Sequence, residues 1–192
     1  MPDTDVQVAE LAARVERCEA YEQIRQLAAR YGAGLDARDI DAVVALYVDD
    51  GRPVWFARVP EGVPGGATLR AAYRASQSRY SQSQHFMCNH VIELDDDDHA
   101  HGVVYALVHQ EMGEHWTIAA MQYWDRYERQ HGRWLFAERR PHSWYFTEWE
   151  RKPTGPLKSR QPGQEPRPAQ LPDAFPTWKP FWDSIAADPP PG

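Results

Sequence analysis

The sequence predicts an α+β domain in which helices come first and an antiparallel sheet follows. Apolar residues such as Ile24, Leu27 and Tyr31 recur at helical spacing in the N-terminal part of the chain. Further along, four segments rich in Val, Ile, Tyr, Trp and Phe are separated by short acidic or glycine-bearing turns, which is typical of a β-meander. After Arg151 the composition changes again, since eleven of the 16 prolines lie at or beyond Pro153.

The helical part divides at glycines and at a capping aspartate. Gly32 and Gly34 are expected to end the first helix. Asp39 is expected to cap a second helix, and the apolar face of this helix runs to Tyr47. A turn at 49–51 is expected to end it. The remaining bounds expected from the pattern are a first helix over 6–35, a short strand over 52–58, a loop over 60–66 and a third helix over 68–80.

The sheet and the proline-rich end complete the predicted organisation. Strands are expected over 84–94, 101–112, 115–129 and 133–148. Residues 1–150 are therefore predicted to form one domain, and residues 151–192 an extended arm, because proline excludes helix and central strand. The arm also carries Phe175, Trp178, Phe181 and Trp182, so we expect it to pack on the body or on a neighbouring subunit. The alternative is a mobile linker with an aromatic end.

Composition excludes several classes of protein. The formal net charge is -7 and basic residues do not cluster, so nucleic acid is not an expected partner. No apolar run approaches the ~18 residues of a membrane span, and the polar N-terminus is unlike a signal peptide. Cys18 and Cys88 are too few for a secreted disulfide framework. These features predict a cytoplasmic protein. Its 12% aromatic content favours a large core or a cavity lined by rings.

Polar residues inside apolar elements are the candidates for function. Strand alternation predicts that His85 shares a face with Asn89, and that His109 shares one with Tyr105 in the next strand. If the helices close over that face, these groups converge in one cavity, where buried polar groups need partners. The full candidate set is Tyr31, Asp36, Tyr47, His85, Asn89, His109 and Arg140.

Three stretches resemble the SnoaL-like (nuclear transport factor 2-like) family. They are IRQLAARYGAGLDARDIDAVVALYVDDG, QHFMCNHVIEL and YWDRYERQHGRWLFAERRP, within a resemblance that covers residues 20–150. The resemblance implies a cone-shaped, curved sheet covered by the three N-terminal helices. Scytalone dehydratase, bile-acid 7α-dehydratase and a diarylpropane formaldehyde lyase belong to this family, and several members use an Asp–His pair as the base.

The resemblance also assigns roles by position. Asp36 matches the family aspartate, and His85 matches the family histidine that acts as general base. Tyr31, His109 and Tyr47 match residues that protonate or hold the substrate, and Arg140 matches an arginine that binds an oxyanion. Arg139 is the alternative to Arg140, because a β-bulge would exchange the two.

The chemistry suits these residue types. A histidine near neutral pKa can take a proton from carbon or oxygen, and a carboxylate on its other nitrogen fixes the tautomer. The resemblance therefore implies a cofactor-independent lyase acting on a bulky aromatic small molecule, either a dehydratase or a formaldehyde lyase on a lignin-derived diarylpropane. We expect a homo-oligomer, a dimer or a trimer. The residues expected to bind substrate are Tyr47, Asn89, Trp55, Phe56, Tyr105 and Trp144.

Other functions remain open from the sequence. A non-catalytic binding module, or a small subunit of a ring-hydroxylating dioxygenase, has the same fold, and fold alone does not give function. His90, His99 and His101 flank an acidic turn, yet we expect no metal site there, because alternation places His85 and His90 on opposite faces and no zinc motif is present.

Overall fold

The computed structural model describes residues 4–53 and 65–187, with the backbone alone at 50–53 and 65. In this part of the chain, helices α1 (Thr4–Asp36), α2 (Ile40–Val44) and α3 (Gly65–Gln77) accompany a sheet, and α4 (Trp178–Ala187) lies near the C-terminus. The strands are β1 (Tyr47–Pro53), β2 (Gln82–Leu94), β3 (His99–Met112), β4 (His115–Gln130) and β5 (Arg133–Glu148). The predicted α+β class is therefore confirmed.

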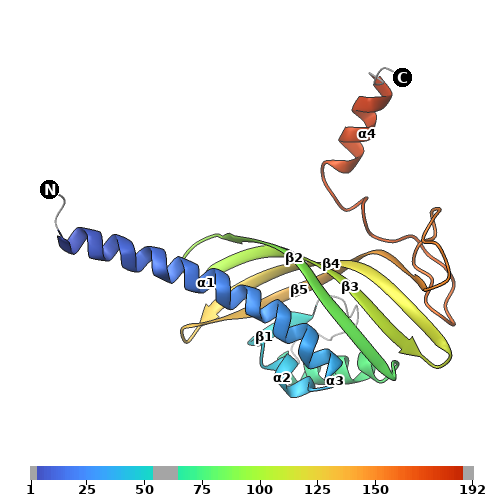
Figure 1. Ribbon diagram of the computed structural model, residues 1–192, viewed down its shortest axis with the longest axis horizontal. Coiled ribbons are helices and arrows are strands. Elements are labelled where there is room, and N and C mark those ends of the chain that lie inside the picture. Colours follow the sequence, from blue (N-terminus) through green and yellow to red (C-terminus); the bar gives the residue numbers. More distant parts are fainter. Residues whose placement is uncertain (1–3, 54–64, 188–192) are drawn as a thin grey trace.

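The sheet is curved, open and mixed. Its strand order is β1-β5-β4-β3-β2, with hairpin neighbours antiparallel and β1 parallel to β5. The prediction of a purely antiparallel sheet is wrong at this edge, because β1 enters after a helix and not after a hairpin turn. Figure 1 shows α1 lying across one face of the curved sheet, with α2 and α3 beside its lower end.

The segment after α2 differs from the prediction. Asp39 caps α2 as expected, since its carboxylate accepts a 3.0 Å hydrogen bond from the Ala42 amide. The helix, however, ends at Val44 and Tyr47 begins β1, where the Phe136 amide donates a hydrogen bond to the Leu46 carbonyl. Parallel pairing with β5 thus extends the chain here, and the residues predicted to form a turn, 49–51, belong to the strand.

The core lies between the C-terminal half of α1 and the inner face of the sheet. Ile24, Tyr31 and Phe136 are among its most deeply buried members. The N-terminal half of α1 is different, because every residue from 4 to 19 is exposed and this half extends beyond the sheet in Figure 1. No helix in the described ranges combines the length and apolar character needed to cross a bilayer.

The C-terminal segment lies along the second half of β5. Among the described residues β1 pairs with β5 only between Phe136 and Arg139, which leaves the later part of β5 without a strand partner on the side away from β4. There Phe146 pairs with Ser159, and the Leu171 amide donates a 3.0 Å hydrogen bond to the Ser143 carbonyl. The segment thus covers a strand edge whose amides and carbonyls would otherwise be unpaired.

The predicted arm is not extended throughout. Residues 178–187 form α4, which projects away from the body in Figure 1. The prediction that prolines exclude a helix here is wrong, because Pro180 lies in the first turn, where backbone amides have no partner within the helix. Phe175, just before this helix, packs against Trp124 and Trp144 with ring centroids 6.2 and 5.7 Å away.

Candidate active site

A carboxylate and an imidazole form the centre of the site. Asp36 Oδ1 lies 2.6 Å from His85 Nδ1, and Asp36 Oδ2 accepts a 2.8 Å hydrogen bond from the His85 backbone amide. The His85 side chain is only 4% exposed. Because an ionised carboxylate only accepts hydrogen bonds, Nδ1 must carry the ring proton, and Nε2 is left to exchange protons.

The end of α1 and the start of β2 bring this pair together. α1 ends at Asp36, and Gly32 lies one turn earlier against β2. A Cβ at Gly32 would lie 3.1 Å from Met87 Cγ and 3.2 Å from His85 Cβ, so the missing side chain allows the close approach. The glycine predicted to end the helix instead packs the helix onto the strand that carries the histidine.

Two further polar residues hold the carboxylate. Ser83 Oγ donates a 3.0 Å hydrogen bond to Asp36 Oδ1, and Arg38 Nη1 donates a 2.8 Å hydrogen bond to Ser83 Oγ. Arg38 also donates to the carbonyls of Leu35 and Tyr80, and its backbone has a left-handed φ of 60°. This turn therefore ties the C-terminal end of α1 to β2.

The hydrogen bonds keep Asp36 ionised. Burial raises the pKa of this carboxyl. The opposing effects are larger, and they come from the hydrogen bonds of the His85 ring and amide, the His85 charge and the Ser83 hydroxyl, so the pKa of Asp36 is below its ordinary value. The carboxylate can therefore fix the His85 tautomer and stabilise the imidazolium that forms when Nε2 takes a proton.

His85 lines a cavity of about 540 Å³. The cavity lies between the inner face of the sheet, the ends of α1 and α3, and the C-terminal segment. Tyr31, Tyr123 and Phe146 contribute rings to its wall, and Val108 and Met121 contribute aliphatic surface. Its size and mixed lining suit a small organic molecule with one or two rings.

Tyr31 and Tyr123 give the cavity two buried phenols. Their rings lie 5.7 Å apart, and Tyr31 also lies edge-on to His85 at 6.3 Å. Burial is the main cause that raises the pKa of both hydroxyls, while the charge of nearby Arg139 opposes it. Both phenols thus remain protonated at neutral pH and can donate hydrogen bonds.

Arg139, and not Arg140, faces the core. It is fully buried and donates two hydrogen bonds, of 2.9 and 2.7 Å, to the carboxylate of Asp125. Its guanidinium carbon lies 4.3 Å from the centroid of the Tyr31 ring and 4.4 Å from that of Tyr123. Arg140 is half exposed and pairs with Glu138 on the outer face.

A bulge decides between the two arginines. On β4, Arg126 and Tyr127 are consecutive, but their partners on β5 are Glu138 and Phe136. The extra residue on β5 shifts the alternation, so Arg140, four positions after the buried Phe136, turns outward and Arg139 turns inward. The expectation that Arg140 faces the cavity is therefore wrong. Arg139 is the arginine that turns inward, where it packs against Tyr31 and Tyr123 behind the cavity wall and does not itself line the cavity.

A second bulge removes Asn89 from the site. Met87 pairs with Ala106 but His90 pairs with Val104, so β2 has one residue more than β3 between these pairs. Asn89 is therefore exposed, and His90 shares the inner face with His85, contrary to the prediction. His90 Nε2 lies 2.9 Å from the hydroxyl of the buried Tyr127.

The outer face of the sheet holds two other predicted residues. His109 contacts the rings of Phe86, Trp116 and Trp149 at 5.3 to 6.0 Å, and Tyr105 is 38% exposed. The two do share a face, as alternation predicted, but Val108 and Gln110 from the same strand line the cavity instead. The expected convergence of His109 with His85 is therefore wrong.

The remaining predicted binding residues do not line the cavity where they are described. Tyr47 is buried against Tyr73, with 2.5 Å between the two hydroxyl oxygens. Trp144 packs against Phe175. Trp55 and Phe56 lie outside the described residues.

Sequence reasoning missed several polar groups of the site. Alternation places Asp125 on one strand face with Tyr123 and Tyr127, and a carboxylate on an aromatic face marks a buried polar partner. Ser83 follows from alternation, because it lies two residues before His85 on the same strand. Gln77 and the residues from 159 to 170 carried no such signal, since tertiary packing alone brings them to the cavity.

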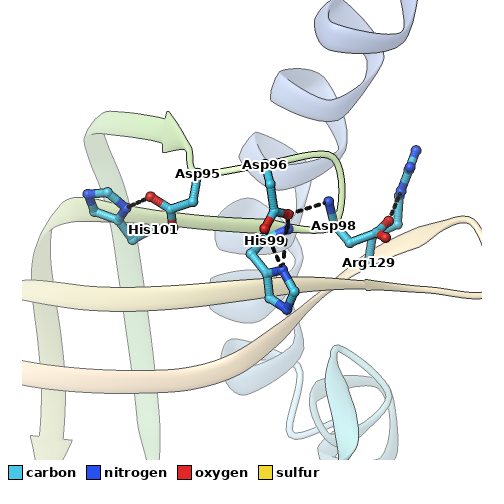
Figure 2. Close-up of polar contacts among 6 residues, drawn as sticks. All are labelled: Asp95, Asp96, Asp98, His99, His101 and Arg129. Carbon is cyan, nitrogen blue, oxygen red and sulfur yellow. Dashed lines mark hydrogen bonds and ion pairs between the residues drawn. The ribbon is translucent and has the colours of Figure 1, made fainter.

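The acidic turn between β2 and β3 is made of separate pairs. Figure 2 shows His99 against Asp96, His101 against Asp95, and Arg129 donating to Asp98. Asp96 also accepts hydrogen bonds from the backbone amides of Asp98 and His99, which shapes the turn. Across the described residues, no three His, Cys, Asp or Glu side chains are arranged to hold a metal ion.

Comparison with known proteins agrees with this fold. A sequence model of the SnoaL-like domain matches residues 16–140. Among curated proteins, none matches the chain in sequence.

Several solved structures superpose on the chain. A Novosphingobium aromaticivorans DSM 12444 chain, provisionally assigned as a scytalone dehydratase, superposes with a TM-score of 0.62 at 17% identity, over 79% of this chain and 99% of that chain. Hexachlorocyclohexane dehydrochlorinase LinA-type3 from Novosphingobium barchaimii LL02 superposes with a TM-score of 0.63 at 21% identity, over 71% and 94%. A nuclear transport factor 2-like protein from Novosphingobium aromaticivorans is 26% identical, with a TM-score of 0.55 over 73% and 90%.

Proposed function

Since the chain belongs to the SnoaL-like family, we propose that it is a lyase that works by acid–base chemistry of its own side chains. The observation that carries this proposal is the 2.6 Å contact between Asp36 and His85, whose ring forms part of the wall of the cavity. A non-catalytic binding site has no need for a carboxylate that fixes the tautomer of a buried histidine side chain. The names of two similar structures, a provisionally assigned dehydratase and a dehydrochlorinase, both denote eliminations, which supports this class of reaction.

The proposed reaction begins at His85. Its Nε2 takes a proton from a carbon or hydroxyl of the substrate, and Asp36 stabilises the resulting imidazolium. In a dehydration, the electron pair of the broken C–H bond forms a C=C bond as the neighbouring C–O bond breaks. The leaving hydroxyl takes a proton from a cavity phenol, Tyr31 or Tyr123, and departs as water. The imidazolium then returns its proton to the phenolate.

A second reaction fits the same groups. If His85 takes the proton of a primary hydroxyl, the adjacent C–C bond can break to release formaldehyde. The electron pair of that C–C bond then forms a C=C bond and expels a hydroxyl from the next carbon, and a phenol protonates the leaving hydroxyl. The cavity of about 540 Å³ and its aromatic wall support a bulky aromatic substrate for either reaction. Formaldehyde appears only in the second reaction, so its detection separates the two.

The test is a product screen with matched variants. The protein is incubated with hydroxylated ring compounds and with diaryl-1,3-propanediols, and released formaldehyde is trapped while loss of water is followed by mass spectrometry. We expect one class to react, His85→Ala to lower the rate by about 10²–10⁴-fold, and the exposed His99→Gln to leave the rate unchanged. A site that binds these compounds without converting any of them, or a His85→Ala variant as active as the parent, would contradict the proposal.

A further inference from the structure

The charge of the cavity wall differs from that of the whole chain. The formal net charge of the protein is -7. The described residues that line the cavity nevertheless include Arg79 and Arg167 and contain no aspartate or glutamate. Since acidic residues dominate the surface elsewhere, a wall whose only formal charges at neutral pH are positive favours a negatively charged ligand group.

The C-terminal segment places Arg167 at the cavity. Ser159 and Arg167 exchange two backbone hydrogen bonds of 2.9 Å, and Ser159 also pairs with Phe146 of β5. Arg160 fixes the preceding turn, because its guanidinium donates to the carbonyls of Leu157, Lys152 and Thr154. The loop that carries Arg167 is thus held against the sheet, and it lies beyond residue 140, where the match to the family domain ends.

Arg79 approaches the same opening from the end of α3. Its Nη2 donates a 3.3 Å hydrogen bond to Gln161 Oε1, which links α3 to the C-terminal segment. Some of the other arginines are held by carboxylates, as Arg139 is by Asp125 and Arg129 by Asp98. Within the described ranges neither the Arg79 nor the Arg167 guanidinium lies within 4.0 Å of a carboxylate oxygen. Both residues are exposed and line the cavity, which places them at its mouth.

A buried amide points to the polarity of the ligand. Gln77 lines the cavity and is 6% exposed, and its Oε1 has no hydrogen-bond partner among the described residues. Leaving a buried acceptor unpaired costs about 1–3 kcal/mol, so a turn of the Gln77 side chain that let a ligand hydroxyl donate to this oxygen would remove the cost. A hydroxyl inside and an anionic group at the mouth are thus both matched by the wall.

We propose that Arg167 and Arg79 form an anion subsite at the mouth of the cavity, which binds the carboxylate of a hydroxylated aromatic acid. This inference rests on the proposed function only in placing the substrate in this cavity. The ring system lies among Tyr31, Tyr123 and Phe146, and the carboxylate reaches the two guanidinium groups. Arginine suits this role because its planar donors match the two oxygens of a carboxylate.

The test compares two probes of the same shape, one an anion and the other neutral. Naphthalene-2-carboxylate and its neutral isostere naphthalene-2-carboxamide are titrated by calorimetry into the full-length protein at low salt. We expect the carboxylate to bind about tenfold more tightly than the amide, because charge-assisted hydrogen bonds are stronger than neutral ones. In Arg167→Gln and Arg79→Gln this preference should fall, while affinity for the amide is kept.

Controls separate this proposal from the proposed reaction. Arg133→Gln removes the same charge at the opposite end of β5 and should keep the full preference for the carboxylate. His85→Ala should also keep it, because the subsite does not depend on the base. Equal binding of the two probes, no binding of either, or an equal loss for both probes in Arg167→Gln would overturn the subsite, whatever the outcome of the product screen.

Discussion

Asp36 contacts His85 at two points, since one carboxylate oxygen lies 2.6 Å from the ring nitrogen Nδ1 and the other accepts a hydrogen bond from the His85 amide. The second contact anchors the carboxylate to the backbone of β2, so the ring cannot turn without losing its partner. The carboxylate therefore acts on both the orientation and the tautomer of the imidazole.

The two residues should behave as one unit in kinetics. On a substrate identified by the product screen, Asp36→Asn should lower kcat by about two to four orders of magnitude, because the amide neither fixes the tautomer nor stabilises the imidazolium. The double variant with His85→Ala should be no slower than the slower single variant, since groups that act as a unit are not additive. Strictly additive losses in steady-state kinetics would show that the two act separately.

The Arg139–Asp125 pair should dominate the stability of the core around the site. Arg139→Met leaves a buried carboxylate without its partner, and such a change costs about 3–5 kcal/mol in the free energy of unfolding. Arg140→Gln, on the outer face, should cost no more than about 0.5 kcal/mol. Urea unfolding of the two variants measures both values, and similar losses would contradict the inward orientation of Arg139.

His90 should make the protein less stable in mild acid. Burial lowers the pKa of this imidazole to about 4, whereas nearby Asp125 raises it in part. In the unfolded chain the pKa of His90 is near 6.5, so between pH 6.5 and 4 the imidazole is protonated in the unfolded state and neutral in the folded state. The free energy of unfolding therefore falls as the pH drops from about 6.5 towards 4. We expect His90→Gln to lose this part of the dependence. Parallel unfolding profiles for the parent and the variant over that range would contradict it.

Gly32 should be intolerant of a side chain. A Cβ there would lie 3.1 Å from Met87 Cγ and 3.2 Å from His85 Cβ, so in Gly32→Ala these two β2 side chains must shift by a few tenths of an ångström. We expect a loss of about 1–3 kcal/mol in the free energy of unfolding and reduced activity. Gly66→Ala is the matched control, because its Cβ would meet only Val44 at an ordinary 3.8 Å. If both variants were equally stable, close packing at Gly32 would not be what places the histidine.

Local pattern predicted the long strands and α1. In the C-terminal half of α1 the apolar periodicity agrees with burial at Ile24, Leu27 and Tyr31, whereas the apolar residues of its N-terminal half are exposed. The pattern failed where one residue resets the alternation. The bulge after Met87 exchanges Asn89 for His90 on the inner face, and the bulge in β5 exchanges Arg140 for Arg139. Both follow from pairing with a neighbouring strand, which no local window of sequence contains.

The resemblance supplied the pairing of Asp36 with His85, which lie 49 positions apart, and the structure brings the two together. It could not supply Arg167, which lies beyond the family domain, or Gln77, whose position depends on how α3 packs. His109 was misplaced because alternation defines two faces but does not say which one the helices cover.

The tautomer of His85 tests the central claim most directly, because it needs no substrate. Nitrogen-15 NMR of the ring, at a pH where it is neutral, distinguishes a protonated Nδ1 from a protonated Nε2. We predict a proton on Nδ1, shared with Asp36, and a free lone pair on Nε2, with this preference lost in Asp36→Asn. A proton on Nε2 in the parent protein would leave the cavity without its base and would contradict the account.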